Sequence, residues 1–107
     1  MKEIFKEIYI NNNPSKYMIS NTGRIYSLKT NKELIPTIDP DGYVVATLYV
    51  DGEYYYYRVH RLVMDYFYEG EVDCKESINH IDGDKANNNI SNLEYCTVEY
   101  NNWHFRN

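Results

Sequence analysis

The stretch that decides the fold is Ile78-Asn79-His80-Ile81-Asp82-Gly83-Asp84-Lys85, followed after a run of asparagines by Leu93-Glu94-Tyr95-Cys96. Residues 78–81 and 93–96 have the composition of short strands, and the loop between them is rich in turn-forming residues. Thr97 is a preferred helix N-cap residue, so a helix is expected from there to about residue 105. The stretch therefore predicts a ββα unit.

Upstream of this unit the sequence predicts strands. Residues 43–49 and 54–59 flank Asp51-Gly52, a pair that tolerates the positive φ angles of a tight antiparallel turn. A further strand is expected at residues 24–28, after the turn signal at residues 21–23. The apolar spacing then changes to that of a short helix after His60.

The expected fold class is α+β. It consists of a small antiparallel sheet with a short helix, followed by the C-terminal ββα unit. We expect a β-rich lobe over residues 1–70 and the ββα motif over residues 71–107.

Composition limits the kinds of function. The 107 residues suffice for one compact domain, and Lys plus Arg number 11 against 16 Asp plus Glu, which gives a net charge of −5. That balance argues against the usual basic footprint of a nucleic-acid-binding protein. Most of the acidic excess falls after residue 70, whereas the N-terminal part is locally basic around Lys16, Arg24, Lys29 and Lys32. These four side chains are the candidates for contacts with backbone phosphates.

The remaining composition suggests an intracellular protein. The longest apolar run, residues 44–50, is too short to cross a bilayer, and the N-terminus is too charged for a signal peptide. With two cysteines and no C-x-x-C pair, reduced thiols are expected and a four-thiolate zinc site is excluded. We expect a cytoplasmic protein without a membrane partner.

Four side chains of the ββα unit are candidates for chemistry. His80 ends the first strand and Asn92 precedes the second, while Asn101 and His104 are three residues apart on one helical face. If the helix packs across the two strands, all four converge. Such a group can place a base, the imidazole of His80, beside a divalent cation.

Several segments follow one another along the chain in a recognisable order. They are residues 17–28, residues 59–63 with Phe67, residues 79–85 and 88–95, and then Thr97 and Asn101. In this order they resemble the HNH endonucleases of phages and intron-homing elements. Residues 17–28 resemble the small N-terminal DNA-binding module of the NUMOD4 kind that accompanies these nucleases. The resemblance covers nearly the whole chain.

The resemblance implies a metal-dependent hydrolysis of phosphodiester bonds in double-stranded DNA. His80 matches the general base, Asn92 the residue that holds the loop and the histidine in position, and Asn101 a ligand of Mg²⁺, Mn²⁺ or another divalent cation. The expected products are a 5′-phosphate and a 3′-hydroxyl. One such site cuts one strand at a time, so a monomer should nick DNA and a homodimer could cut both strands.

The sequence also departs from the family pattern. The residue before the catalytic histidine is often an acidic or histidine metal ligand, but here it is Asn79, whose amide oxygen can ligate a cation without adding charge. Asp82 and His104 are candidates to compensate. The chain ends directly after the ββα unit, so extended recognition of a target site is not expected.

Alternatives stay open for the function of the chain and for the role of Arg61. The chain could be a catalytically weak HNH-derived module that binds nucleic acid or protein, such as a phage regulator or an anti-defence protein. Arg61 could contact a phosphate or pair with a carboxylate. His60, at the start of an apolar helix face, is expected to be a core or capping histidine.

Overall fold

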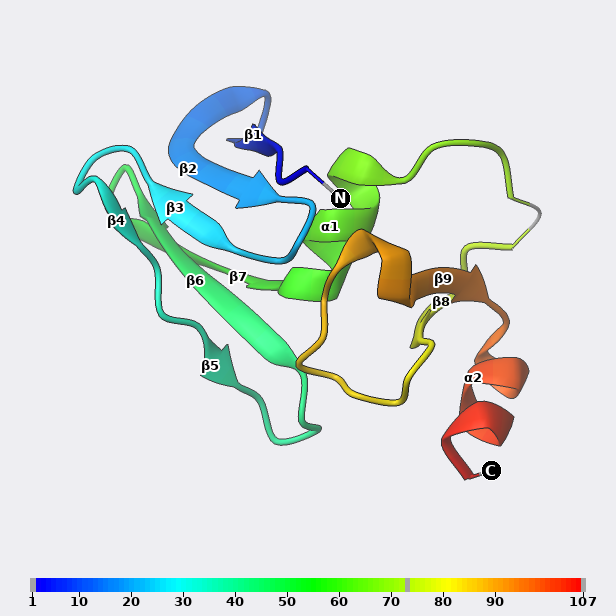
Figure 1. Ribbon diagram of the computed structural model, residues 1–107. Coiled ribbons are helices and arrows are strands. Elements are labelled where there is room, and N and C mark those ends of the chain that lie inside the picture. The colour runs from blue at the N-terminus through cyan, green and yellow to red at the C-terminus, as the bar shows by residue number, and fades with distance from the viewer. Residues whose placement is uncertain (1, 73, 107) are drawn as a thin grey trace.

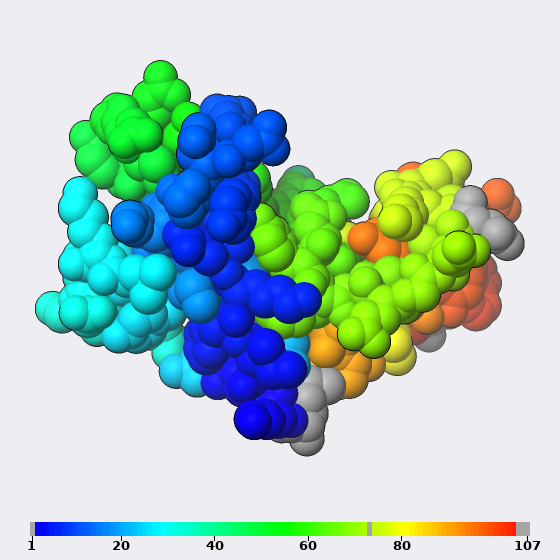
Figure 2. All heavy atoms as spheres, turned by 90° about the horizontal axis from the view of Figure 1, so that it is seen from above, coloured from blue at the N-terminus to red at the C-terminus, as the bar shows by residue number. Residues whose placement is uncertain are grey.

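The computed structural model describes residues 2–72 and 74–106 as three antiparallel sheets and two α-helices (Figure 1). The predicted α+β class is confirmed. The molecule is elongated, with extents of 42 × 31 × 27 Å. Figure 2 shows the C-terminal segment, in orange and red, at one end, and the N-terminal strands, in blue and cyan, toward the other end, where part of the green middle of the chain also lies.

The first sheet contains four strands in the order of the chain. They are β1 (Phe5–Ile10), β2 (Asn13–Ser20), β3 (Ile25–Ser27) and β4 (Lys32–Glu33). Of these four strands, only the segment of β3 was predicted from the sequence. The turn between β1 and β2 is made by Asn11 and Asn12, both at positive φ, a conformation that asparagine tolerates better than most residues.

The second sheet contains β5 (Thr37–Ile38), β6 (Val44–Val50) and β7 (Glu53–Arg58). The predicted hairpin between β6 and β7 is confirmed, because Asp51 and Gly52 at its turn have φ angles of 51° and 81°. Side chains alternate along β7: Tyr54 and Tyr56 are exposed, whereas Tyr55 and Tyr57 pack against the core.

Helix α1 (Val59–Phe67) follows β7 without a loop and buries its apolar face in the core. It ends three residues before Gly70, the expected stop, since Tyr68 already has extended backbone angles. The same core cluster contains Ile78 and Leu93 from the C-terminal segment. One hydrophobic core thus extends across the boundary expected at residue 70, and the division into two lobes stays a prediction.

The C-terminal segment is the predicted ββα unit. It consists of β8 (Ser77–His80), the 3-10 helix η1 (Ile90–Asn92), β9 (Leu93–Cys96) and α2 (Val98–Arg106). Thr97 caps α2 as expected, because its Oγ1 accepts a hydrogen bond from the Tyr100 amide at 3.0 Å. No helix in the described residues is long and apolar enough to span a membrane.

Candidate active site

His80 is the last residue of β8, opposite Leu93 of β9, and its side chain is buried. Its Nε2 lies 2.8 Å from Oδ1 of Asn88. An amide oxygen only accepts, so Nε2 carries the proton and Nδ1 is the basic nitrogen of the neutral ring. Nδ1 has no hydrogen-bond partner among the described side chains, those of residues 2–72 and 74–104, and no side-chain nitrogen or oxygen there is both buried and unpartnered. Nδ1 therefore reaches solvent and can accept a proton.

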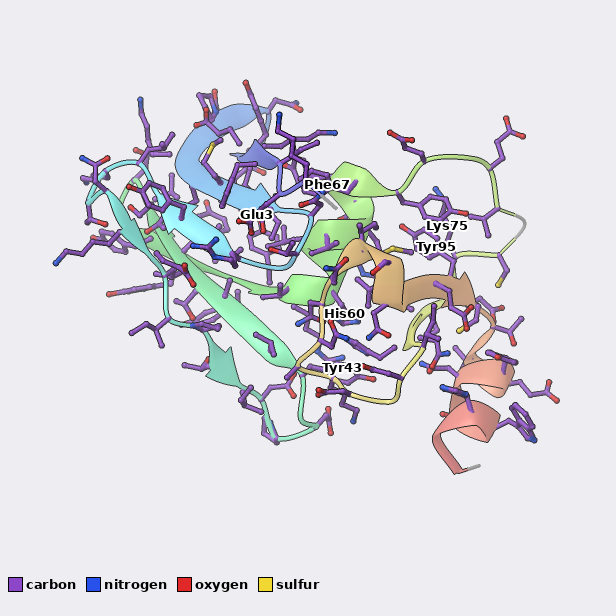
Figure 3. All side chains as sticks on the ribbon, viewed as in Figure 1. Glu3, Tyr43, His60, Phe67, Lys75 and Tyr95 are labelled. Atoms are coloured by element: carbon purple, nitrogen blue, oxygen red, sulfur yellow. The ribbon has the colours of Figure 1, made fainter. Side chains whose placement is uncertain are left out.

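A second histidine lies against His80. The His60 ring centroid is 5.2 Å from that of His80 and 5.0 Å from that of Tyr43, to which it is nearly parallel. Tyr43 lies next to His60, which belongs to the first turn of α1 (Figure 3). Burial, and then the proximity of His80, lowers the pKa of His60 to about 3, so this ring is neutral near pH 7. His60 is buried, as predicted, and it forms one wall of the His80 site.

The loop that carries Asn88 is supported by the first sheet. Asn21, in the turn after β2, accepts a hydrogen bond from the Ile90 amide at 2.8 Å. Gly23 in the same turn has a φ of +91°, and a Cβ added there would lie 2.9 Å from Cβ of Asn88. Asn88 was not predicted as a site residue, since one asparagine in the run 87–89 carries no distinguishing signal.

Asn92 holds the same loop from the other side. Its Oδ1 accepts from the Asp82 amide at 3.1 Å, and its Nδ2 donates to Oδ1 of Asp82 and to the Asn87 carbonyl, both at 2.9 Å. Oδ2 of Asp82 accepts from Nδ2 of Asn87, and Oδ1 also accepts from the Asp84 amide. These hydrogen bonds, first that of Asn87, lower the pKa of Asp82. Both carboxylate oxygens of Asp82 are thus engaged in the loop.

Helix α2 places Asn101 and His104 against β8. Nδ2 of Asn101 donates to Oγ of Ser77 at 2.7 Å, and Nε2 of His104 lies 3.1 Å from the carbonyl oxygen of Ile81. Asn101 thus contacts the start of β8, and His104 contacts the residue that follows β8, so the two contacts lie on either side of Asn79 along the chain. Helix α2 thus packs against β8.

Asn79 faces α2, whereas His80 faces the opposite side of β8. Residues alternate along a strand, so Asn79 shares its face with Ser77, which Asn101 contacts, while His80 points toward Asn88 and His60. No hydrogen bond or ring contact in the described part of the chain joins His80 to Asn101 or His104. His80 is therefore not in direct contact with Asn101 or His104, and their convergence on one metal site stays a prediction.

The donor set beside α2 favours a hard cation. No group of three or more His, Cys, Asp or Glu side chains suited to a metal occurs among residues 2–72 and 74–106. The oxygen donors are instead the amides of Asn79 and Asn101 and the carboxylate of Glu94, which accepts a hydrogen bond from Asn79 at 2.8 Å. Oxygen ligands of this kind suit Mg²⁺, Mn²⁺ or Ca²⁺ better than zinc.

The predicted phosphate contacts fall into two classes. Arg24 is engaged in ion pairs of 2.6 Å with both Glu3 and Glu33. Lys16, Lys29 and Lys32 are exposed, and none of them forms an ion pair among the described residues. They lie at one end of the first sheet. The Leu28 amide donates a hydrogen bond to the Lys16 carbonyl, and Ser27 and Lys32 are register partners in the β3–β4 pair.

Arg61 is an exposed residue of α1. No ion pair between Arg61 and a carboxylate occurs in the part of the chain that the structure describes. A phosphate contact by Arg61 stays a prediction.

Family models match both parts of the chain. A model described as HNH endonuclease matches residues 57–103, and one described as NUMOD4 motif matches residues 3–49. The first match contains α1, the site around His80 and most of α2. The second contains the first sheet and the basic residues at its end.

Curated relatives and a solved structure carry the same description. An uncharacterized HNH endonuclease, L245, of Acanthamoeba polyphaga mimivirus is 42% identical over 83% of this chain and 27% of its own length. DNA endonuclease I-HmuI of Bacillus phage SP01 is 40% identical over 79% of this chain and 48% of its own. A solved structure described as "DNA binding and cleavage by the HNH homing endonuclease I-HmuI" matches with a TM-score of 0.78 and 36% identity, over 94% of this chain and 56% of that one. The chain spans about half or less of the length of these curated relatives.

Proposed function

Because the chain belongs to the HNH endonuclease family, with a NUMOD4 motif before the HNH segment, we propose that it hydrolyses phosphodiester bonds of double-stranded DNA with the help of a divalent metal ion. The observation that carries this proposal is the hydrogen-bonding of the His80 ring. Its Nε2 is held by Asn88, and its Nδ1 is free to take a proton from an attacking water.

Residues of the loop and of α1 hold His80 in position. Asn88 fixes which ring nitrogen is basic, and the tilted contact with the His60 ring, 5.2 Å between centroids, limits rotation of the His80 ring. Asn92 holds the two ends of the loop 82–87 together through its three hydrogen bonds to Asp82 and Asn87. Asn92 is therefore a positioning residue in this proposal, and His80 is the catalytic base.

The metal would be held on the α2 side of β8 by Asn79 and Asn101, with His104 next to them. A bound divalent cation supplies charge neutralisation at the scissile phosphate and at the leaving 3′ oxygen. Mg²⁺ and Mn²⁺ fit the amide and carboxylate oxygens present. Asp82 remains a weaker candidate because its oxygens are already hydrogen-bonded within the loop.

DNA would contact the exposed lysines at the end of the first sheet. Lys16 is four residues before the end of β2, so roughly 13 Å of strand separates it from the turn that supports Asn88. That length corresponds to about four base pairs of rise along DNA, so a duplex that reaches the turn beside Asn88 would also pass Lys16. The proposed product is a nick from a monomer, or a double-strand cut from a homodimer.

An analysis of product ends tests this chemistry. A labelled duplex is incubated with the protein and Mg²⁺ or Mn²⁺, with EDTA as the control. We expect EDTA-sensitive nicks that T4 DNA ligase can reseal, because resealing requires a 5′-phosphate and a 3′-hydroxyl. Nicks that form equally in EDTA, or that cannot be resealed until their ends are repaired, would contradict the mechanism.

A second candidate function is a catalytically weak HNH-derived binding module. Two observations favour it: the neutral residue at Asn79 and the net charge of −5. This reading predicts binding to a nucleic-acid or protein partner without turnover and without a gain in thermal stability from divalent ions. A rise in melting temperature with Mn²⁺ concentration favours the endonuclease instead.

A further inference from the structure

The amide ligands proposed for the metal leave its charge uncompensated. Asn79 and Asn101 each contribute a neutral oxygen, and Asp82 is engaged in its own loop. A divalent cation is bound far more strongly where at least one ligand is a carboxylate. One carboxylate of the ββα unit, that of Glu94, lies next to Asn79.

Glu94 lies directly across from Asn79. The two residues are register partners in the antiparallel pair of β8 and β9, and partners of this kind project from the same face of a sheet. Nδ2 of Asn79 donates to Oε1 of Glu94 at 2.8 Å. Both side chains therefore lie on the face that α2 covers through Asn101.

The hydrogen bonds leave oxygens available on all three side chains. Asn79 and Asn101 donate through Nδ2, and Glu94 accepts through Oε1. Oδ1 of each asparagine and Oε2 of Glu94 have no partner among the side chains that the structure describes, those of residues 2–72 and 74–104. Because no side-chain oxygen in these ranges is both buried and unpartnered, Oδ1 of the buried Asn79 is open to solvent.

Glu94 is also reachable from solvent. It lines a hollow of about 430 Å³ between β9 and the start of α2, together with Cys74, Cys96, Thr97 and Tyr100. No other Asp or Glu among the described residues lines this hollow. A hydrated cation can thus approach Glu94 from the hollow.

We propose that Glu94 is a ligand of the metal and supplies the negative charge that Asn79 lacks. This inference rests on the proposed function, since it concerns the same metal site. Glu94 then compensates for the neutral residue before His80, a role for which the sequence suggested Asp82 or His104. The Asn79–Glu94 hydrogen bond holds the two side chains next to each other on one face of the strand pair.

Isothermal titration of the purified full chain with Mn²⁺ tests the assignment. Glu94→Gln keeps an oxygen that can accept from Asn79 but removes the charge, so its melting temperature in EDTA should match the wild type. Its Mn²⁺ affinity should fall by about tenfold or more, since even residues that only support ligands change metal affinity on that scale. Glu99→Gln, an exposed charge on α2, is the matched control and should bind Mn²⁺ like the wild type.

A restoring variant separates a ligand from a structural residue. In Asn79→Asp/Glu94→Gln the carboxylate is moved across the strand pair, and Mn²⁺ affinity should return to within about threefold of the wild type, because the ligand charge count is restored. If Glu94→Gln binds Mn²⁺ like the wild type while Asn101→Ala does not, the role of Glu94 is wrong and the proposed function stands. If the wild type binds no Mn²⁺, both proposals fail.

Discussion

Nε2 of His80 lies 2.8 Å from Oδ1 of Asn88, and the two side chains are only 5% and 4% exposed. A buried hydrogen bond of this kind fixes both the orientation and the tautomer of an imidazole. It leaves Nδ1 as the nitrogen that can act as a base. The loop 82–89 therefore takes part in the proposed chemistry by holding His80.

Removing the Asn88 amide should impair catalysis. In Asn88→Ala the buried Nε2 proton loses its acceptor, which costs about 1–3 kcal/mol of folding free energy. The nicking rate should fall by at least about tenfold, because general-base catalysis depends on the ring geometry. Asn88→Asp keeps an acceptor oxygen and should retain more of the rate. Equal loss in both variants, at temperatures where both are folded, would argue against this role.

Gly23 should matter for the same loop. Gly23→Ala introduces a side chain at a φ of +91° and brings its Cβ to 2.9 Å from Cβ of Asn88. Gly52→Ala is the matched control, because Gly52 has a φ of +81° but open space around it. Both variants should lose about 1–3 kcal/mol from backbone strain. Only Gly23→Ala should lose nicking activity as well as stability. Equal activity of Gly23→Ala and Gly52→Ala would refute the coupling between the turn and the site.

The pH dependence of stability should report on His60. Its pKa in the folded protein, about 3, lies below the ordinary value of 6.5, so the unfolded chain binds the extra proton between these values. Its contribution to stability is complete above pH 6.5 and is lost as the pH falls toward 3, by up to about 1.4 kcal/mol per pH unit. His60→Phe keeps a ring beside Tyr43 and removes this titration. Urea unfolding from pH 7 to pH 4 should therefore show a shallower slope for the variant than for the wild type, and identical slopes would contradict the assignment.

The exposed lysines should govern the salt dependence of DNA binding. Lys29→Gln/Lys32→Gln should weaken binding to all sequences and reduce the slope of log K against log salt by about 1.8 if each lysine contacts one phosphate. Arg24→Gln should change this slope less, because Glu3 and Glu33 already pair with its guanidinium. Binding isotherms on one duplex at several salt concentrations measure both effects. A slope that the double variant leaves unchanged would remove these lysines from the interface.

Much of the fold was predictable from local sequence signals. The hairpin at Asp51-Gly52 and the capped helix after Thr97 were predicted because their turn and cap residues act over a few neighbours. The β1–β2 hairpin was missed because its turn, Asn11-Asn12, is not one of the usual dipeptide signals and its strands contain polar residues. Strands of this kind are determined by packing against α1, which a local pattern does not contain.

The site was predicted less completely than the fold. The positions of His80, Asn92 and Asn101 followed from the motif, but their exact partners depend on tertiary contacts. Asn88 contacts His80 only because the turn at Gly23 supports the loop, and Glu94 contacts Asn79 only through the strand register. Arg24 was expected to be available to phosphates, whereas folding brings it between two glutamates.

The most direct test of the central claim is the rate of nicking by the wild type and by His80→Ala, measured on supercoiled plasmid with saturating Mn²⁺. Mn²⁺ titration and thermal unfolding of the same preparations establish that both proteins are folded and metal-bound. The proposed mechanism predicts metal-dependent relaxed circles from the wild type and a rate lower by about 10²–10⁴-fold in His80→Ala, the usual contribution of a general base. Equal rates in the two proteins, or no relaxed product from the wild type, would contradict it.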